Sequence, residues 1–130
     1  PPIIIPPTPE EKSAMRRGLG IDDKQEVALV FFEVQTEWAF RRWFNNWITT
    51  PQTKTILICP EDAHARKILF EVCNPAVLVA SGMIIVDSLN VELAADMFYC
   101  FRYRDDVIRQ RRIPVKIMDV SNRFKSSVLI

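Results

Sequence analysis

The sequence is poor in the residues that catalytic and cofactor-binding motifs usually need, because it holds three glycines and a single histidine, His64. Glycines let a backbone approach phosphate groups closely, so three glycines leave little material for a phosphate-binding loop. A single histidine excludes most Ser-His and Cys-His nucleophile pairs, unless His64 itself takes part. We therefore predict a protein that is not an enzyme and that holds no cofactor.

Cysteine is also scarce: Cys59, Cys73 and Cys100 lie far apart, with no CxxC pair. Zinc sites usually show tighter ligand pairs. Glu61 and His64 share one face of a predicted helix, but carboxylate metal sites need several such ligands, so we predict no metal site. An odd number of widely spaced cysteines is typical of buried free thiols, which favours a reducing, intracellular compartment.

Long hydrophobic runs and an excess of one charge are absent as well. The longest apolar candidate, AVLVASGMIIV, is interrupted by Ser81-Gly82 and falls short of the about 18 residues of a membrane-spanning helix, so we predict no membrane span. Lys and Arg total 17 against 16 Asp and Glu, whereas proteins that coat nucleic acid usually carry a clear basic excess. A hydrophobic content of 48% is that of an ordinary globular domain.

Proline is concentrated at the start of the chain. Residues 1–9, PPIIIPPTP, hold five prolines. Proline fixes φ and removes a backbone donor, so these residues predict an extended, proline-rich arm. Ile3, Ile4 and Ile5 have nothing within such an arm to bury against. We expect them either to fold back on the chain's own domain or to contact a partner.

Residues 10–121 are predicted to form a single α/β domain, and residues 122–130 a C-terminal tail with an apolar end. After a short helix over roughly 9–17, with Thr8 and Glu11 as a capping box, the hydrophobic patterns follow the order β-α-β-α-β-β-α-β. Ser81-Gly82 either joins two strands in a tight hairpin or lies within one longer strand. The strands are predicted at 26–34, 54–59, 76–80, 83–87 and 115–120, and the helices between Thr36 and Pro51, from Pro60 to about Cys73, and over about 90–112.

Alternating strands and helices favour an α/β fold, with a mixed sheet of about five strands and packed helices. Residues 54–120 have the β-α-β-β-α-β order of ferredoxin-like folds. The same residues, about half the chain, resemble response-regulator receiver domains in three segments, ILICPEDAHARKILFEV, MIIVDS and IPVKIMDV. The resemblance implies a three-layer, receiver-like fold. Both alternatives stay open.

The resemblance to receiver domains does not extend to their chemistry. Where receivers carry an acidic pair after the first strand, this sequence has Cys59-Pro60. Lys116 lies at the start of its predicted strand instead of the end, although Asp87 would occupy the phosphoacceptor position. The resemblance therefore implies the fold without phosphorylation.

All three tryptophans lie in one stretch, TEWAFRRWFNNW, at residues 36–47. Trp38 lies at the edge of an apolar helical stripe, which consists of Phe40, Trp43, Phe44, Trp47 and Ile48. A large aromatic side chain buries roughly 150–250 Å², and aromatic residues are enriched at protein interfaces. The stripe is either core alone or core with an interface at Trp38 and Trp43, and both interpretations stay open.

Residues 102–112, RYRDDVIRQRR, combine five arginines with Tyr103. Such a combination can bind phosphates or stack on nucleic-acid bases. Against this, Asp105 and Asp106 lie among the arginines, and arginines at a helix end also stabilise the helix. The candidate nucleic-acid contacts are Arg102, Arg104, Arg109, Arg111 and Arg112.

Four features present more apolar surface than a chain of this size is expected to cover: the arm, the aromatic stripe, the first half of the 90–112 helix and the tail. We therefore predict a non-catalytic structural or adaptor subunit of a larger protein assembly, which binds other protein subunits or self-associates. A nucleic-acid-binding module that uses residues 102–112 is the alternative. The predicted partner contacts are Ile3, Ile4, Ile5, Trp38, Trp43, Phe124 and Leu129.

Overall fold

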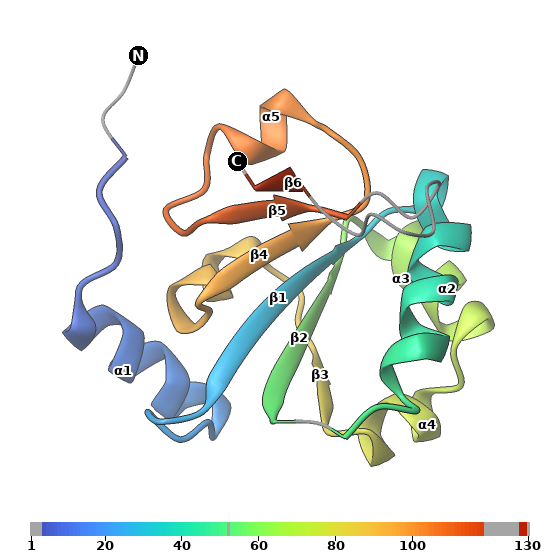
Figure 1. The fold of residues 1–130 in the computed structure, drawn as a ribbon, viewed down its shortest axis with the longest axis horizontal. Coiled ribbons are helices and arrows are strands. Elements are labelled where there is room, and N and C mark those ends of the chain that lie inside the picture. Colours follow the sequence, from blue (N-terminus) through green and yellow to red (C-terminus); the bar gives the residue numbers. More distant parts are fainter. Residues whose placement is uncertain (1–3, 52, 119–127, 130) are drawn as a thin grey trace.

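The computed structural model describes residues 4–51, 53–118 and 128–129. They form an α/β fold around a six-stranded sheet in the order β3-β2-β1-β4-β5-β6 (Figure 1). Strands β1 to β5 are parallel, and β6 is antiparallel to β5. The predicted α/β class with a mixed sheet is confirmed. The strands are β1 Glu26–Phe32, β2 Lys54–Pro60, β3 Met83–Ile85, β4 Met97–Cys100, β5 Val115–Ile117 and β6 Val128–Leu129.

Helices lie on both faces of the sheet, so the molecule has three layers (Figure 1). Helices α2, α3 and α4 pack on one face, and α1, η2 and α5 pack on the other. No helix in the described part of the chain is long and apolar enough to cross a membrane. The helices are α1 Pro9–Leu19, α2 Glu37–Trp47, α3 Ala63–Val72, α4 Pro75–Ala80 and α5 Asp105–Ile108, and the 3-10 helices are η1 Val34–Thr36 and η2 Leu89–Ala94.

The strand order reverses between β1 and β4, which makes this position the topological switch point of the sheet. From β1 the chain moves outward through β2 to β3, and then returns to β4 and β5 on the other side. Right-handed crossovers place the helices of these two halves on opposite faces. Every pair among β1–β5 is parallel, which excludes the ferredoxin-like alternative. The order also differs from the 2-1-3-4-5 order of receiver-like folds.

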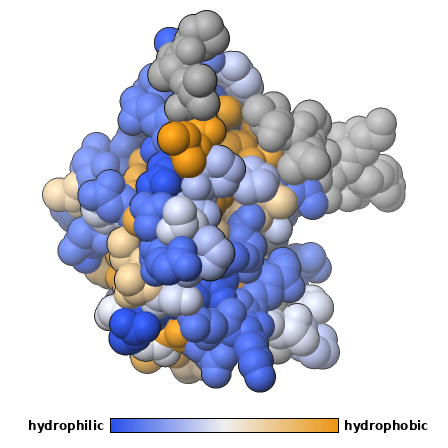
Figure 2. Space-filling view, turned by 90° about the vertical axis from the view of Figure 1, so that its left-hand side faces the viewer, coloured by the Kyte–Doolittle hydropathy of each residue, from blue (hydrophilic) through white to orange (hydrophobic). Residues whose placement is uncertain are grey.

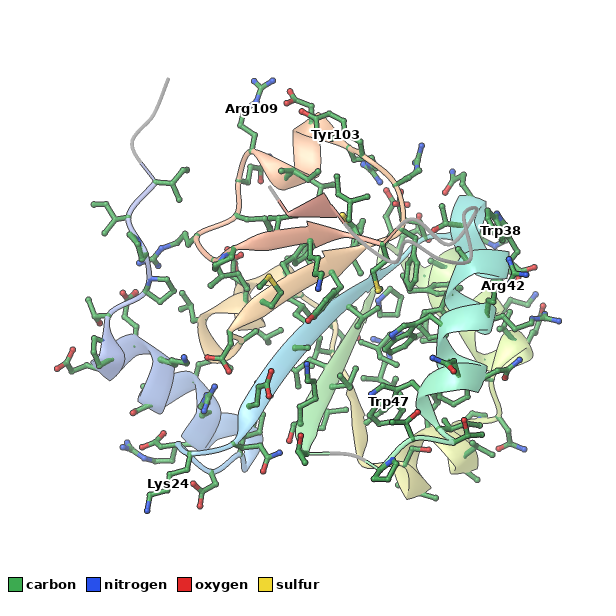
Figure 3. All side chains as sticks on the ribbon, in the orientation of Figure 1. Lys24, Trp38, Arg42, Trp47, Tyr103 and Arg109 are labelled. Atoms are coloured by element: carbon green, nitrogen blue, oxygen red, sulfur yellow. The ribbon has the colours of Figure 1, made fainter. Side chains whose placement is uncertain are left out.

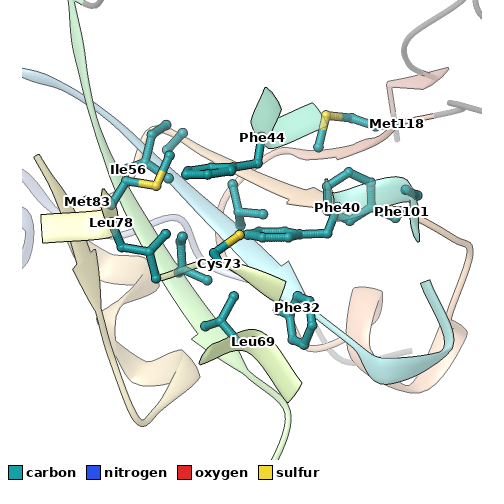
Figure 4. Packing of buried hydrophobic residues seen from close by; sticks show 14 of the residues in the cluster. Phe32, Phe40, Phe44, Ile56, Leu69, Cys73, Leu78, Met83, Phe101 and Met118 are labelled. Atoms are coloured by element: carbon teal, nitrogen blue, oxygen red, sulfur yellow. The ribbon is translucent and has the colours of Figure 1, made fainter. Parts of the chain in front are cut away.

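Strand β1 contributes to two separate hydrophobic cores, because successive side chains of a strand point to opposite faces. Val30 and Phe32 belong to the cluster beneath α2 and α3, where Phe32 packs beside Phe40 (Figure 4). Leu29 and Phe31 belong to the cluster beneath η2 and α5. All four strand residues are at most 3% exposed. The apolar run at 26–34 therefore predicted correctly a strand covered on both sides, but the strand ends at Phe32, because Val34 already begins η1.

The first helix is also confirmed. Glu11 N donates to Thr8 Oγ1 at 3.1 Å, and Thr8 N donates to Glu11 Oε1 at 3.0 Å, which completes the predicted capping box. Arg16 on this helix is 2% exposed and donates its Nε to Ala94 O at 2.9 Å. This contact fixes α1 against η2, on the sheet face opposite α2.

The predicted strand at 76–80 is wrong, because these residues form α4. Ala76 N donates to the side-chain oxygen of Asn74 at 2.8 Å, and Pro75 occupies the first turn, so both helix-start preferences are met. A run of five apolar residues fits a buried strand and a buried helix equally well. The hairpin is wrong too, since Gly82 (φ +79°) follows the end of α4 and β3 pairs in parallel with β2.

The predicted helix over 90–112 is wrong as well, because the chain there forms η2, β4 and α5 in succession. Phe98 and Cys100 face one core, and Tyr99 faces the other. The apolar character on all sides therefore belongs to a strand enclosed by both layers. The last predicted strand, 115–120, is confirmed for Val115–Ile117, and residues 119–120 lie outside the described part of the chain.

Candidate functional site

The carboxyl ends of the strands at the switch point form the first candidate site, since ligands of doubly wound folds bind there. Glu33 follows β1, and Arg102 and Arg104 follow β4. The Glu33 side chain is 1% exposed. Arg102 Nη2 donates to Glu33 Oε2 at 2.8 Å, and Arg104 Nη1 donates to the same oxygen at 2.7 Å. Two guanidinium groups therefore neutralise one buried carboxylate.

Arg104 extends this ion-pair cluster to the end of β2 and to α5. Its Nη1 also donates to Glu61, directly after β2, and its Nη2 donates to Asp106 Oδ2 at 2.7 Å. The hydrogen bonds that Arg104 donates to Asp106, Glu61 and Glu33 raise its pKa above the usual range. The three guanidinium nitrogens of Arg104 already donate to carboxylates. The cluster therefore holds the carboxyl ends of the strands together, and it does not offer its arginines as a phosphate-binding site.

A cavity of about 370 Å³ adjoins the cluster. Burial raises the pKa of the Cys59 thiol in its wall to about 11, so this thiol stays protonated near neutral pH. Asp87 at the rim pairs with Arg66. The Cys59 thiol is therefore not activated as a nucleophile, and the connection from Glu33 to α2 has no glycine to approach a phosphate. The lining residues are Phe31, Cys59, Pro60, Glu61, Asp87, Ser88, Leu89, Arg104 and Val107.

No group of His, Cys, Asp or Glu among the described residues is arranged to hold a metal ion. Cys59, Cys73 and Cys100 are buried free thiols, as the sequence predicted. Burial raises the pKa of each thiol to about 11. In this state the thiols act as small apolar core residues.

The second candidate site is a hollow between α2 and the sheet, which we name the aromatic groove. Trp43 and Trp47, one turn apart on α2, stack with ring centroids 6.1 Å apart. Figure 3 shows Trp47 between α2 and the sheet. The groove holds about 310 Å³ and is lined by Ala28, Val30, Trp43, Asn46, Trp47, Thr50, Pro51, Thr53, Lys54, Ile56 and Tyr99.

The aromatic stripe of α2 serves the core at two positions and the aromatic groove at two others. Phe40 and Phe44 are 0% and 4% exposed. Trp43 and Trp47 are partly buried and line the groove. Across from them, β1 presents Ala28, whose short side chain leaves the space that a longer side chain would fill.

The aromatic groove is nearly free of charge. Among the described residues its one charged lining residue is Lys54, whose Nζ lies 3.1 Å from Glu26 Oε1 and 5.9 Å from the Tyr99 ring centroid. Burial lowers the pKa of Lys54, but the interactions with Glu26 and Tyr99 together more than offset this effect, so the pKa is raised. An uncharged, apolar occupant would therefore bind without leaving an ion unpaired.

The partner contacts predicted from the sequence do not meet at one place. Trp43 lies in the aromatic groove, whereas Trp38, 51% exposed, lies on the outer side of α2 (Figure 3). Ile4 and Ile5 of the arm are 42% and 66% exposed. Leu129 lies in β6 opposite Lys116 of β5. Ile3 and Phe124 lie outside the described residues.

The five arginines predicted to contact nucleic acid do not share one helix. Two of them belong to the ion-pair cluster around Glu33. Arg109, directly after α5, pairs with Asp105, and Arg112 Nη2 lies 2.9 Å from Glu11 Oε1. Carboxylates therefore neutralise the charges of these four side chains.

Arg111, the fifth of these arginines, is a core residue. Its side chain is 6% exposed, its Nη1 lies 3.6 Å from Glu92 Oε2, and its guanidinium carbon lies 5.1 Å from the Phe98 ring centroid. Burial raises the pKa of Glu92, although Arg111 opposes this effect. A buried side chain in this position has no access to a nucleic-acid backbone.

Two residues of the candidate sites were not predicted from the sequence. Tyr99 lay inside the wrongly predicted helix, so its place across from Trp43 and Trp47 was not foreseen. Glu33 is an acidic residue directly after a buried strand, and that position at the carboxyl edge of the sheet was the available signal.

Comparison of the chain with protein-family models, curated proteins and solved structures finds no match.

Proposed function

We propose that this chain is a non-catalytic structural or adaptor subunit, and that its aromatic groove receives an uncharged, apolar segment of a protein partner. The observation that supports this proposal best is the groove itself. Two tryptophans and a tyrosine line it, and Lys54, the one charged side chain in its described lining, is already paired. Aromatic side chains bind well at interfaces because they bury much area at a small cost in rotamer entropy.

An extended, proline-rich segment suits the aromatic groove best. Polyproline II segments dock in aromatic-lined grooves, and they lose little entropy because their conformation is preformed. Their backbone carbonyls accept hydrogen bonds, and Asn46 and Thr53 of the groove carry side-chain donors. The exposed Trp38 offers a second contact for a larger partner, on the other side of α2. The buried free thiols support an intracellular, reducing location.

The nucleic-acid-binding alternative has less support. Four of the five arginines pair with acidic residues at 3.0 Å or less, and the fifth is buried beside Glu92. Neutralised arginines release few counterions from nucleic acid, so they contribute little affinity.

The test is the binding of a fluorescently labelled, end-blocked octaproline peptide, followed by fluorescence anisotropy. We expect a dissociation constant on the order of 10⁻⁴ M, because the contact is far smaller than the roughly 1,200 Å² of stable complexes. Trp47→Ala removes half of the stacked pair, and Asn46→Glu adds a charge at an exposed groove residue. Each should weaken binding at least about tenfold.

Trp38→Ala is the matched control, since it removes an exposed tryptophan from the same helix outside the groove. We expect it to bind octaproline like the parent chain. Absence of peptide binding, or binding that neither groove variant weakens, would contradict the proposed function.

A further inference from the structure

The sheet is open at β3, on the side that faces away from β2. Strand β3 ends the strand order of the described sheet, so it has a neighbour on one side only. On that side, Val86 N donates to Ile58 O at 2.9 Å, in register with the pairing of β2 and β3. Backbone groups of successive strand residues point to alternate sides, so the N–H and C=O groups of Met83 and Ile85 point away from β2. Such groups are a template for pairing with another strand.

Most of the devices that protect a sheet edge are not used at β3. Charged side chains, proline, bulges and short length usually keep edge strands from pairing with other chains. Residues 74–86, NPAVLVASGMIIV, carry no charge, and their one proline begins α4. Met83–Ile85 pair with Ile56–Ile58 residue by residue, without a bulge. The one protection that remains is the length of three residues, which limits what backbone pairing alone can contribute.

Helix α4 enlarges the surface beside this edge, because it contacts β3 and leads into it. Leu78 of α4 is 0% exposed, whereas Val77 and Val79 are 41% and 72% exposed. The side of the molecule that carries α1 is hydrophilic over most of its described surface (Figure 2), and α4 lies on the other side (Figure 1). We name residues 74–86 the β3 edge surface, which combines unpaired backbone groups with uncharged, apolar side chains.

The edge of β3 is complementary to a second copy of itself in antiparallel orientation. A two-fold axis at Ile84 places Met83 of each copy opposite Ile85 of the other copy. Each of these two pairs can exchange two N–H···O=C hydrogen bonds, since both residues point their backbone groups outward. Ile84 then lies opposite Ile84 of the second copy, in the non-hydrogen-bonded position between the two pairs. All four outward groups of each copy are satisfied in this register.

The charged residue nearest to this edge does not oppose the pairing. The Asp87 side chain is 83% exposed and pairs with Arg66 of its own chain. The antiparallel register about Ile84 places Asp87 opposite Ser81 of the second copy, which carries no charge. The two Asp87 carboxylates therefore lie at opposite ends of the paired strands, where they do not repel each other strongly.

We propose that the β3 edge surfaces of two copies meet about a two-fold axis at Ile84, so that antiparallel pairing of β3 joins two sheets into one in a symmetric dimer. A second copy suits this edge because its outward backbone groups, its uncharged α4 and its position of Asp87 all match under one symmetry operation. Every contact in such a dimer is made twice. No residue of the β3 edge surface belongs to the described lining of the aromatic groove, so this inference does not rest on the proposed function.

The first test is sedimentation equilibrium of the full chain over a range of concentrations. We expect a reversible monomer–dimer equilibrium with a dissociation constant on the order of 10⁻⁵ M, because the contact is smaller than the roughly 1,200 Å² of stable complexes. Ile85→Pro removes an outward N–H that pairing with β2 does not use. This loss occurs twice in the dimer, so the dissociation constant should rise at least about tenfold.

Ile85→Ala is the matched control, because it also shortens the side chain but keeps the backbone N–H. We expect it to dimerise like the parent chain. Urea denaturation of both variants shows that they are folded, so that a change in dimerisation reports on the edge and not on unfolding.

Disulfide cross-linking tests the register of the pairing. In Ile84→Cys the two introduced thiols lie opposite each other, with Cα atoms about 4.5 Å apart, which a disulfide can span. Mild oxidation should therefore give a covalent dimer. Ser81→Cys is the matched control, since the proposed register leaves its two thiols far beyond the about 7 Å limit between Cα atoms. The three native cysteines are buried, so they should not cross-link.

Three results would overturn the inference: a parent chain that is monomeric at every concentration, a dimer that Ile85→Pro does not weaken, or Ile84→Cys that cross-links no better than Ser81→Cys. The last two would mean that the copies meet at another surface. Octaproline should bind Ile85→Pro as it binds the parent chain, because the aromatic groove is unchanged. A parent chain that dimerises but binds no octaproline would refute the proposed function alone.

Discussion

At the scale of single residues, buried charge decides which side chains the fold must hold in place. Glu33 is 1% exposed, and a carboxylate in such a position is tolerated when cations and hydrogen bonds satisfy it. Arg102 and Arg104 supply both, from the loop after β4. The network thereby connects the carboxyl ends of β1 and β4 across the switch point of the sheet.

Glu33→Gln should lower the free energy of unfolding by roughly 2–3 kcal/mol, because it removes the charge that two guanidinium groups share. Urea denaturation of both proteins measures the difference. Asp106→Asn is the matched control, since Asp106 is exposed, and we expect a loss below about 1 kcal/mol there. Equal losses for the two variants would show that burial of the Glu33 pair contributes nothing.

The contact between Glu11 and Arg112 predicts a pH dependence at the residue scale. Hydrogen bonding to Arg112 lowers the pKa of Glu11 from 4.5 to about 2. A lowered carboxyl pKa stabilises the fold above pH 4.5, and this contribution is lost as the pH falls from 4.5 toward 2.

Urea midpoints at pH 6 and pH 3 measure this contribution. We expect Glu11→Gln to lose less stability between these two pH values than the parent chain does, because it lacks the titrating group. Glu10→Gln is the control, since Arg112 donates to Glu11 and the substitution leaves that contact in place. An unchanged pH response of Glu11→Gln would refute the link between this ion pair and acid stability.

At the scale of elements, patterns that end in clear capping signals were predicted well, and short apolar runs were not. The capping box at Thr8 and the long run of β1 gave correct elements. Residues 76–80 and 97–100 are equally apolar, but one segment is α4 and the other is β4. The local signal that separates them is Asn74-Pro75, a cap and a first-turn proline that begin α4 but were interpreted from the sequence only as the end of the preceding helix.

Two glycines offer a direct comparison of helix interior with helix end. Gly82 has φ +79° after α4, whereas Gly18 lies inside α1, and a Cβ would meet no atom within 4 Å at either position. Gly82→Ala should destabilise by about 1–2 kcal/mol because an L residue is strained at positive φ. Gly18→Ala should stabilise by roughly 0.5–1 kcal/mol through helix propensity.

Thermal or urea unfolding of the two alanine variants tests the end of α4. Stabilisation by Gly82→Ala would contradict the left-handed conformation of Gly82 after α4.

At the scale of the whole molecule, the class of fold followed from the alternation of strands and helices, but the strand order did not. The strand order depends on which strands become neighbours after the crossovers. The residues of β4 were predicted to be part of a helix, so this strand was missing from the predicted sheet. For the same reason, Trp43 was foreseen as a contact residue, whereas its partner Tyr99 across the aromatic groove was not. The groove needs both α2 and β4 in place, so it emerges only in three dimensions.

The indole N–H signals of the three tryptophans report most directly on whether the aromatic groove is the binding surface. A proton–nitrogen NMR spectrum of the full chain records them, and substitution of each tryptophan in turn assigns them. On titration with end-blocked octaproline, we expect the Trp43 and Trp47 signals to shift and the Trp38 signal to stay in place, because Trp38 lies outside the groove. Shifts confined to Trp38, or no shift at saturating peptide, would contradict the account.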